Sequence, residues 1–212
     1  MVGRKFLFWL NSNNWVNDPV EIRKKYIEYT YDGIKKDLML NDLLNDKQGI
    51  EWKIEKNNID LKYNKINKYT HAKENNELLY MHNNISKEKY DFEKNHIEHE
   101  YGNISNYEYE MANAKLKYNY NYISKEEYSR NILDIKFNND VISKKEYDIE
   151  FLNFEYPDKN CNEYKIKLLE IDKNNNIISE EEFLYKINDI TNIKNSDEWA
   201  LEKIDIDRYL GK

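Results

Sequence analysis

The feature that most constrains this chain is a short motif, Ile-Ser-x-x-Glu-Tyr, that recurs at a nearly constant step. Copies begin at Ile85, Ile104, Ile123 and Ile142, about 19 residues apart, and a further copy begins at Ile178 with Phe in the aromatic position. Weaker copies near residues 47, 66 and 159 keep part of the pattern. A fixed period of this length predicts an array of similar units, each packed on its neighbours in the sequence.

The Ser and Glu of the motif are the residue types that cap the start of an α-helix. Ser at the N-cap accepts a hydrogen bond from the amide three residues on, and Glu at that residue reaches back to the N-cap amide. The Ile before the cap and the aromatic residue after it predict a hydrophobic staple. We therefore assign the helix-capping residues a structural role and no catalytic one: Ser105, Glu108, Ser124, Glu127, Ser143, Glu146, Ser179 and Glu182.

Apolar residues after each motif form two stripes on nearly opposite faces of the expected helix. After Ser124, Tyr128 and Ile132 lie on one stripe, and Leu133 and Phe137 lie on the other. A helix with two opposed apolar faces packs between a preceding and a following helix. The second stripe contains Ala114 and Leu152 in the neighbouring copies.

The joints between copies are rich in Asn and Gly, which tolerate the left-handed backbone that ends many helices. Such joints are Asn83-Asn84, Gly102-Asn103, Asn138-Asn139-Asp140 and Asn174-Asn175-Asn176. With joints of about four residues, each helix has roughly 15 residues, and successive helices run antiparallel.

The fold class expected from these patterns is all-α: an array of short antiparallel helices, about 19 residues per repeat, with an irregular N-terminal arm. The chain has only five Gly and two Pro, too few for the turns of a sandwich or barrel. Residues 50–63 alternate in a way that also fits a β-hairpin, but the phase of the repeat favours a helix.

Four regions follow from the period. Residues 1–17 form an aromatic N-terminal arm, residues 18–46 an N-terminal helical region, residues 47–196 the repeat array, and residues 197–212 a short C-terminal helix and tail. Asp18 and Pro19 predict a helix start, Gly33 a point of interruption, and Ser196 the cap of the last helix. The arm either caps the first helices or docks into a partner. Its candidate docking residues are Phe6, Phe8, Trp9 and Trp15.

Charge and cysteine content restrict the function classes. The chain has 33 Lys and Arg against 40 Asp and Glu, a net charge of −7, with the two signs interleaved. This balance argues against a nucleic-acid or anionic-membrane partner. The single cysteine, Cys161, excludes an internal disulfide and fits a structural thiol in a reducing compartment. The apolar run at residues 6–10 is too short for a membrane span or a signal sequence.

No catalytic, cofactor or metal site is expected from the residue patterns. The segment Asp172–Asn176 begins like an EF-hand calcium loop, but Ile177 replaces the Gly of the sharp turn and Phe183 replaces the bidentate Glu. The four histidines, His71, His82, His96 and His99, lack the spacing of a ligand pair with a carboxylate partner. We expect them to be solvated side chains, and we expect no cofactor.

Two resemblances bear on function. The run Ile177-Ile178-Ser179-Glu180-Glu181-Glu182-Phe183 resembles the helix start of the short C-terminal oligomerisation domain (SHOCT) family, which implies self-association. Residues 47–195 look like the tandem Ile-Ser-x-x-Glu-Tyr helical arrays in virion proteins of AT-rich tailed bacteriophages. The second resemblance implies a component of the neck, tail or capsid, located in the virion or the host cytoplasm.

The function expected from the sequence is therefore that of a non-enzymatic structural subunit. It would act through contacts with other protein subunits of an assembly, including copies of itself. The alternative is a soluble helical-repeat adaptor that binds a peptide or a regulatory partner.

Overall fold

The computed structural model describes residues 18–212. The regular secondary structure of these residues is α-helix. Eleven helices cover this part of the chain, and none of these residues lies in a strand. The all-α class expected from the repeat is confirmed. Segment 50–62, which also fitted a β-hairpin, is a continuous helix.

The chain divides into two compact units, Met1–Tyr109 and Glu110–Lys212, and the boundary lies inside helix α7. The described helices of the first unit are α2 (Pro19–Thr30), α3 (Gly33–Leu44), α4 (Ile50–Lys62), α5 (Lys68–Met81), α6 (Lys87–Glu100) and the start of α7 (Asn106–Asn119). The second unit contains the rest of α7, then α8 (Lys125–Asn138), α9 (Lys144–Glu155), α10 (Asn162–Asn174), α11 (Glu180–Thr191) and α12 (Asp197–Tyr209).

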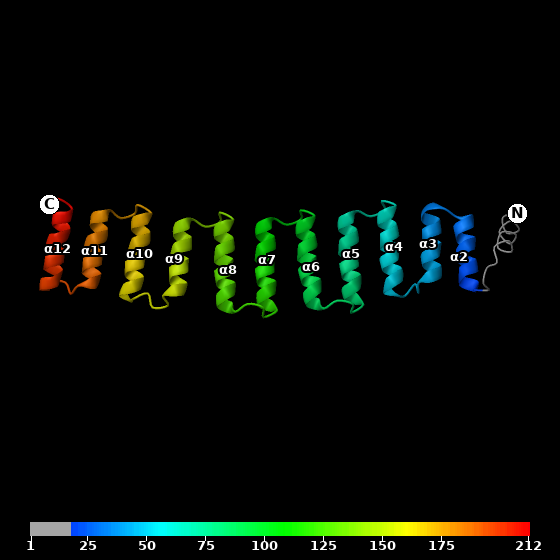
Figure 1. Cartoon of the computed structure of the whole chain (residues 1–212), viewed down its shortest axis with the longest axis horizontal. Helices are drawn as coiled ribbons and strands as arrows, with labels where there is room; N and C mark the ends of the chain where they lie inside the picture. The colour runs from blue at the N-terminus through cyan, green and yellow to red at the C-terminus, as the bar shows by residue number, and fades with distance from the viewer. Residues whose placement is uncertain (1–17) are drawn as a thin grey trace. The chain divides into compact units, whose positions relative to one another are not determined.

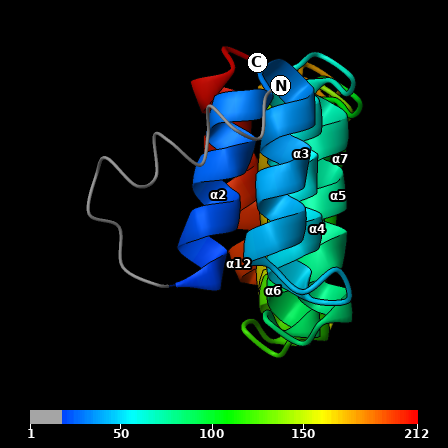
Figure 2. The same cartoon turned by 90° about the vertical axis from the view of Figure 1, so that its right-hand side faces the viewer.

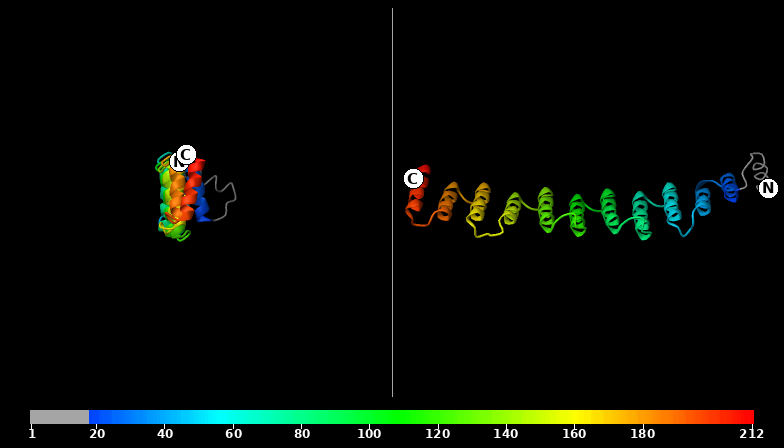
Figure 3. Two further views of the ribbon diagram at one scale, coloured as in Figure 1. Left: turned by 90° about the vertical axis from the view of Figure 1, so that its left-hand side faces the viewer. Right: turned by 60° about the horizontal axis from the view of Figure 1, so that its bottom comes forward.

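Within each unit the helices form a single layer. The helices that pack together are consecutive: α2 to α6 in the first unit, and α8 to α12 in the second. Consecutive helices run in opposite directions (Figure 1), and in the first unit their axes are close to parallel (Figure 2). The joints alternate between the two ends of the helices (Figure 3). Among the described residues of each unit, no helix of that same unit covers the two broad faces of its layer.

The core is a narrow line of residues between neighbouring helices. In the second unit Ala114, Leu133 and Leu152 are buried at successive steps of the repeat, on the stripe that the sequence predicted to be apolar. Most other apolar side chains are partly exposed. Burial of this kind makes each helix depend on its two neighbours for stability.

Aromatic rings pair across the contacts between consecutive helices. Tyr80 stacks on Tyr90 in the first unit with ring centroids 4.7 Å apart, and Tyr118 stacks on Tyr128 in the second unit at 5.0 Å. The second ring of each pair is the aromatic residue of the motif. Such pairs contribute about 0.5–1.5 kcal/mol beyond the area that they bury. The staple between this aromatic residue and the Ile before the cap stays a prediction.

Six joints end a helix with the same left-handed turn. At Asn83, φ is +58°, and the amide of Asn84 donates to the carbonyl of Leu79 over 2.8 Å, as in a Schellman motif. Asn121 and Gly102 have φ values of +59° and +73° at equivalent places. The left-handed residues of the six joints are Asn64, Asn83, Gly102, Asn121, Asp140 and Asn176.

Two details differ from the sequence expectation. The helices have 12 to 14 residues rather than about 15, because the last turn of each repeat is used by the joint. Residues 19–44 form two separate antiparallel helices, α2 and α3, with Tyr31 and Asp32 extended between them. The predicted interruption therefore falls immediately before Gly33, which adopts φ +52° as the first residue of α3.

Candidate protein-docking site

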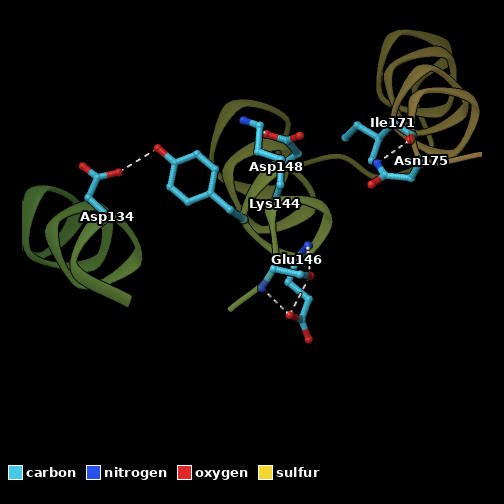
Figure 4. Close-up of polar contacts among 8 residues, drawn as sticks. Asp134, Lys144, Glu146, Asp148, Ile171 and Asn175 are labelled. Carbon is cyan, nitrogen blue, oxygen red and sulfur yellow. Dashed lines mark hydrogen bonds and ion pairs between the residues drawn. The ribbon is translucent and has the colours of Figure 1, made fainter. Parts of the chain in front are cut away.

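The Ser and Glu residues of the motif form the N-terminal caps of the helices. Each of the four pairs predicted from the sequence makes both bonds of a capping box. At Ser143 the amide donates to Glu146 Oε2 over 2.8 Å, and the amide of Glu146 donates to Ser143 Oγ over 3.2 Å (Figure 4). The same two bonds join Ser105 with Glu108, Ser124 with Glu127, and Ser179 with Glu182.

These bonds change the acidity of two of the glutamates. The backbone amide of Ser105 and then its hydroxyl lower the pKa of Glu108, and Ser143 lowers the pKa of Glu146 in the same way. Both carboxylates are therefore stabilised in the charged form that a cap requires. The capping hydrogen bonds therefore account for the lowered pKa values of both glutamates.

Buried asparagines at one position of the repeat join neighbouring helices, and sequence reasoning missed them. Asn57, Asn76 and Asn188 are between 2% and 6% exposed. Each donates from its side-chain amide to a backbone carbonyl of the next helix, over 3.3, 3.1 and 3.0 Å respectively. A buried amide held this way fixes the register between two helices, since leaving it unpaired is costly. The signal was present: Asn57, Asn76 and Asn95 recur every 19 residues or so.

Two helix pairs, α3 with α4 and α11 with α12, share a more elaborate version of this contact. Asn41 donates to the carbonyl of Trp52 over 2.9 Å, and the indole of Trp52 donates to Asp42 over 2.9 Å. Asn188 and Trp199 repeat the first bond, and the indole of Trp199 donates to Asp189 over 2.7 Å. The sequence pattern Asn-Asp-x-x-Asn-x-Lys-x-x-x-Glu-Trp begins at both Asn41 and Asn188, and it could have been found in the sequence.

The α3–α4 pair carries an open groove between its two helices. Its volume is about 620 Å³, within the range of ligand pockets, although it is an open groove rather than an enclosed cavity. Leu40, Leu44 and Ile54 supply apolar lining, while Glu51 and Glu55 supply carboxylates. Leu44 is 53% exposed, so an apolar partner side chain could reach it.

One end of this groove is held by an ion pair between its two helices. Lys62 Nζ lies 2.7 Å from Asp37 Oδ2, and the hydroxyl of Tyr63 donates to the same oxygen over 3.0 Å. The hydrogen bond from Lys62 is the main cause that lowers the pKa of Asp37, and burial acts against it. Burial and the bond to Asp37 raise the pKa of Tyr63. These contacts hold α3 and the C-terminal end of α4 together at this end of the groove.

A second groove, of about 440 Å³, lies between α8 and α9 in the other unit. Ile132, Ile142 and Phe154 line it together with Glu146 and Glu150. Shallow grooves of apolar and acidic character thus recur between neighbouring helices, as a single layer of helices requires. Their lining suits protein side chains better than a small polar ligand.

Several residues singled out from the sequence lie in ordinary packing contacts. Asp172 belongs to α10 and lies 3.3 Å from Lys145, so the calcium-like segment is a helix end. His99 stacks on Tyr109 at 4.3 Å. Cys161 is the N-cap of α10, where its sulfur accepts from the amide of Tyr164 over 3.4 Å. Residues 18–212 contain no cluster of three His, Cys, Asp or Glu side chains that could hold a metal ion.

The predicted docking residues Phe6, Phe8, Trp9 and Trp15 lie outside the described residues. From residue 18 onward, no helix is long and apolar enough to cross a membrane. Searches against protein-family models, curated proteins and solved structures give no match to this chain.

Proposed function

We propose that this chain is a non-enzymatic structural subunit of a large assembly, and that it acts through protein contacts made by the open faces of its helical layers. The observation that supports this most is the single layer in each unit, where helices pack only on their neighbours in the sequence. Apolar side chains such as Leu44, Leu201 and Ile204 remain more than half exposed. Exposed apolar surface of this kind is typical of proteins that are covered by partners.

The assembly that we propose is the particle of a tailed bacteriophage, in its neck, tail or capsid. The resemblance of residues 47–195 to tandem helical arrays of virion proteins supports this choice, as does the Asn, Lys, Ile and Tyr bias of the chain. The repeat offers many similar surfaces along one chain, which suits contacts with subunits arranged at regular intervals.

Purified particles test the proposal directly. The particles are separated on a density gradient, and the chain is measured by quantitative mass spectrometry against known particle proteins. We expect a fixed number of copies per particle. Chymotrypsin is then applied to the isolated chain and to intact particles, and cleavage within residues 1–17 is compared. Absence of the chain from the particles would contradict the proposal.

The groove between α3 and α4 favours a second candidate, an adaptor that binds a peptide. Leu40, Leu44 and Ile54 fit the apolar face of a helix, and Glu51 and Glu55 fit basic residues beside that face. A basic amphipathic peptide is therefore the partner expected of an adaptor. Titration of such a labelled peptide, followed by fluorescence anisotropy, should give binding that Leu44→Lys weakens and Met81→Lys does not. Equal binding to both variants would remove this candidate.

A further inference from the structure

Helix α12 has exposed apolar side chains on the side that faces away from α11. Leu201 is 63% exposed and Ile204 is 53% exposed. The other side of α12 is occupied: Trp199 accepts the bond from Asn188, and Ile206 is only 5% exposed. Among residues 110–212, α11 is the one helix that packs against α12.

The exposed side of α12 corresponds to the side by which earlier helices pack on the next one. In α8, α9 and α11 the residue nine places after the Ser cap is buried, and these residues are Leu133, Leu152 and Asn188. In α4 and α12 the aromatic residue stands three rather than four places after the cap, and the buried residue of α4 is accordingly Asn57, eight places after Gly49. The equivalent residue of α12 is Ile204, eight places after Ser196, and it is 53% exposed. The helix therefore presents to solvent a face that the repeat otherwise uses for a helix contact.

The residues of this face follow an ordered pattern. At 100° per residue, Asp197, Leu201, Ile204 and Arg208 fall within about 60° of the helix circumference. We call these four residues the α12 stripe. An acidic residue stands at its N-terminal end, a basic residue at its C-terminal end, and two apolar residues lie between them. The stripe is neutral, although the α12 helix as a whole is acidic.

We propose that the α12 stripe binds the same stripe of a second copy of this chain, with the two helices antiparallel. A two-fold axis between residues 202 and 203 places Leu201 opposite the partner copy's Ile204. The same axis places Asp197 opposite the partner copy's Arg208. Each pairing occurs twice, because the contact is isologous. The spacing of the four residues is therefore complementary to itself in the antiparallel direction alone.

Charge selects this direction over a parallel one. Parallel packing would bring Asp197 against Asp197 and Arg208 against Arg208, which is unfavourable. Antiparallel packing pairs opposite charges and also sets the helix dipoles in opposite directions. In the single chain Arg208 Nη1 lies 3.2 Å from Asp205, in a bridge whose side chains are 78% and 67% exposed. An exposed bridge of this kind is weak, so Arg208 can turn to the partner copy.

The size of the contact sets its strength. The helix has 13 residues and is about 20 Å long, so one helix pair buries less than the roughly 1,200 Å² of a stable interface. We expect a reversible dimer that depends on concentration and weakens with salt. This inference rests on the proposed function, which it deepens by naming a second copy as one of the partners.

Sedimentation velocity over a wide range of concentrations tests the dimer with the full chain. Leu201→Lys should weaken dimerisation by at least about tenfold, since it places a charge in the apolar centre of the contact. Ile177→Lys is the matched control: Ile177 is 50% exposed in a joint of the same unit, and its replacement should leave dimerisation unchanged. Circular dichroism spectra and melting curves of both variants verify folding.

Charge reversal tests the register. Asp197→Arg and Arg208→Asp should each abolish self-association, because each one opposes like charges at both ends of the contact. An equimolar mixture of the two variants should form a heterodimer, in which both charge pairs are restored. The double variant Asp197→Arg/Arg208→Asp should dimerise as the unchanged chain does.

The outcomes separate this inference from the proposed function. A chain that stays monomeric at every concentration, or a dimer indifferent to Leu201→Lys, overturns the α12 contact. Failure of the mixed variants to associate overturns the antiparallel register. The presence of the chain in purified particles is measured independently, so an assembly subunit without an α12 dimer remains distinguishable from a chain that joins no particle.

Discussion

The side-chain amide of Asn188 donates a hydrogen bond to the backbone carbonyl of Trp199, 3.0 Å away on the next helix. Asn188 is 2% exposed, and its own oxygen accepts from the side chain of Asn192 over 2.8 Å. One buried amide therefore links the C-terminal half of α11 to the first turn of α12. Asn41 makes the same contact with Trp52 in the other unit. The polar groups at these helix contacts specify register, while the thin apolar core supplies the burial.

Replacement of Asn188 tests this role. We expect Asn188→Ala to lower the free energy of unfolding by about 2 kcal/mol, because it leaves the carbonyl of Trp199 and the amide of Asn192 without their partner. Asn188→Leu should cost less, because Leu133 and Leu152 fill the equivalent place in α8 and α9. Urea unfolding followed by circular dichroism at 222 nm gives the values. Asn174→Ala, at an exposed position, is the control. Equal stability of Asn188→Ala and the parent chain would contradict the assignment.

The periodic features of the fold could be predicted from the sequence because they depend on local chemistry. Ser124 and Glu127 identify a helix start, and Asn83 or Gly102 a helix end, through bonds made within a few residues. Opposed stripes around Leu133 predict neighbours on two sides. These signals are sufficient for an antiparallel helical array, and the structure confirms one within each unit.

The contacts between helices were harder to foresee. Asn57 and Asn76 are polar, and a polar residue is buried only where a specific acceptor is available. That acceptor is a carbonyl on the next helix, and its position depends on the length of the joint. The candidate groove between α3 and α4 was missed for a similar reason: its shape depends on how the joint at residues 45–49 places α4 against α3, which local patterns do not specify.

A cap variant tests the helix starts. Ser124→Ala removes the oxygen that accepts from the amide of Glu127 over 3.1 Å, so we expect the unfolding free energy to fall by about 1 kcal/mol. Ser129→Ala changes the same residue type inside the same helix, where Ala is the better helix former, and should not destabilise the chain. Thermal melts compare the stability of the two variants. Indistinguishable melting curves would contradict the capping role of Ser124.

The cysteine cap offers a stabilising change. Sulfur is a weak acceptor, and Cys161 holds the amide of Tyr164 at 3.4 Å where copies such as α8 and α9 use the hydroxyl of a serine. We expect Cys161→Ser to raise the unfolding free energy by about 0.5 to 1 kcal/mol. Cys161→Ala, which has no acceptor, should not raise it. Denaturant unfolding under reducing conditions compares the three proteins, and a gain from Ala equal to that from Ser would show that capping is not the cause.

The left-handed joints predict opposite effects of two glycine changes. Asp140 has φ +55°, a strained value for a residue with a Cβ, so Asp140→Gly should stabilise the chain by about 0.5 to 1 kcal/mol. Gly102 has φ +73° at the equivalent joint, and no atom beyond its two chain neighbours lies within 4 Å of the place that a Cβ would take. Gly102→Ala therefore meets backbone strain alone and should cost about 1 kcal/mol. Chemical denaturation measures both changes. Effects of the same sign would contradict the turn assignment.

Acid should weaken the helix starts through Glu108 and Glu146. Hydrogen bonds from the amide and hydroxyl of the capping serines lower the pKa of both groups in the folded chain. A group with a lowered folded pKa contributes stability above its unfolded pKa, and that stability is lost as the pH falls through the folded pKa. We therefore expect unfolding to become easier as the pH falls below about 4.5, near the ordinary pKa of Glu.

Glu108→Gln with Glu146→Gln keeps an acceptor but removes the titration, so the double variant should show a flatter acid dependence in melts from about pH 7 to about pH 3. Glu93→Gln with Glu150→Gln changes two exposed glutamates outside the capping boxes and is the matched control. If the two double variants lose stability in parallel with the parent chain, the capping carboxylates do not carry the acid sensitivity.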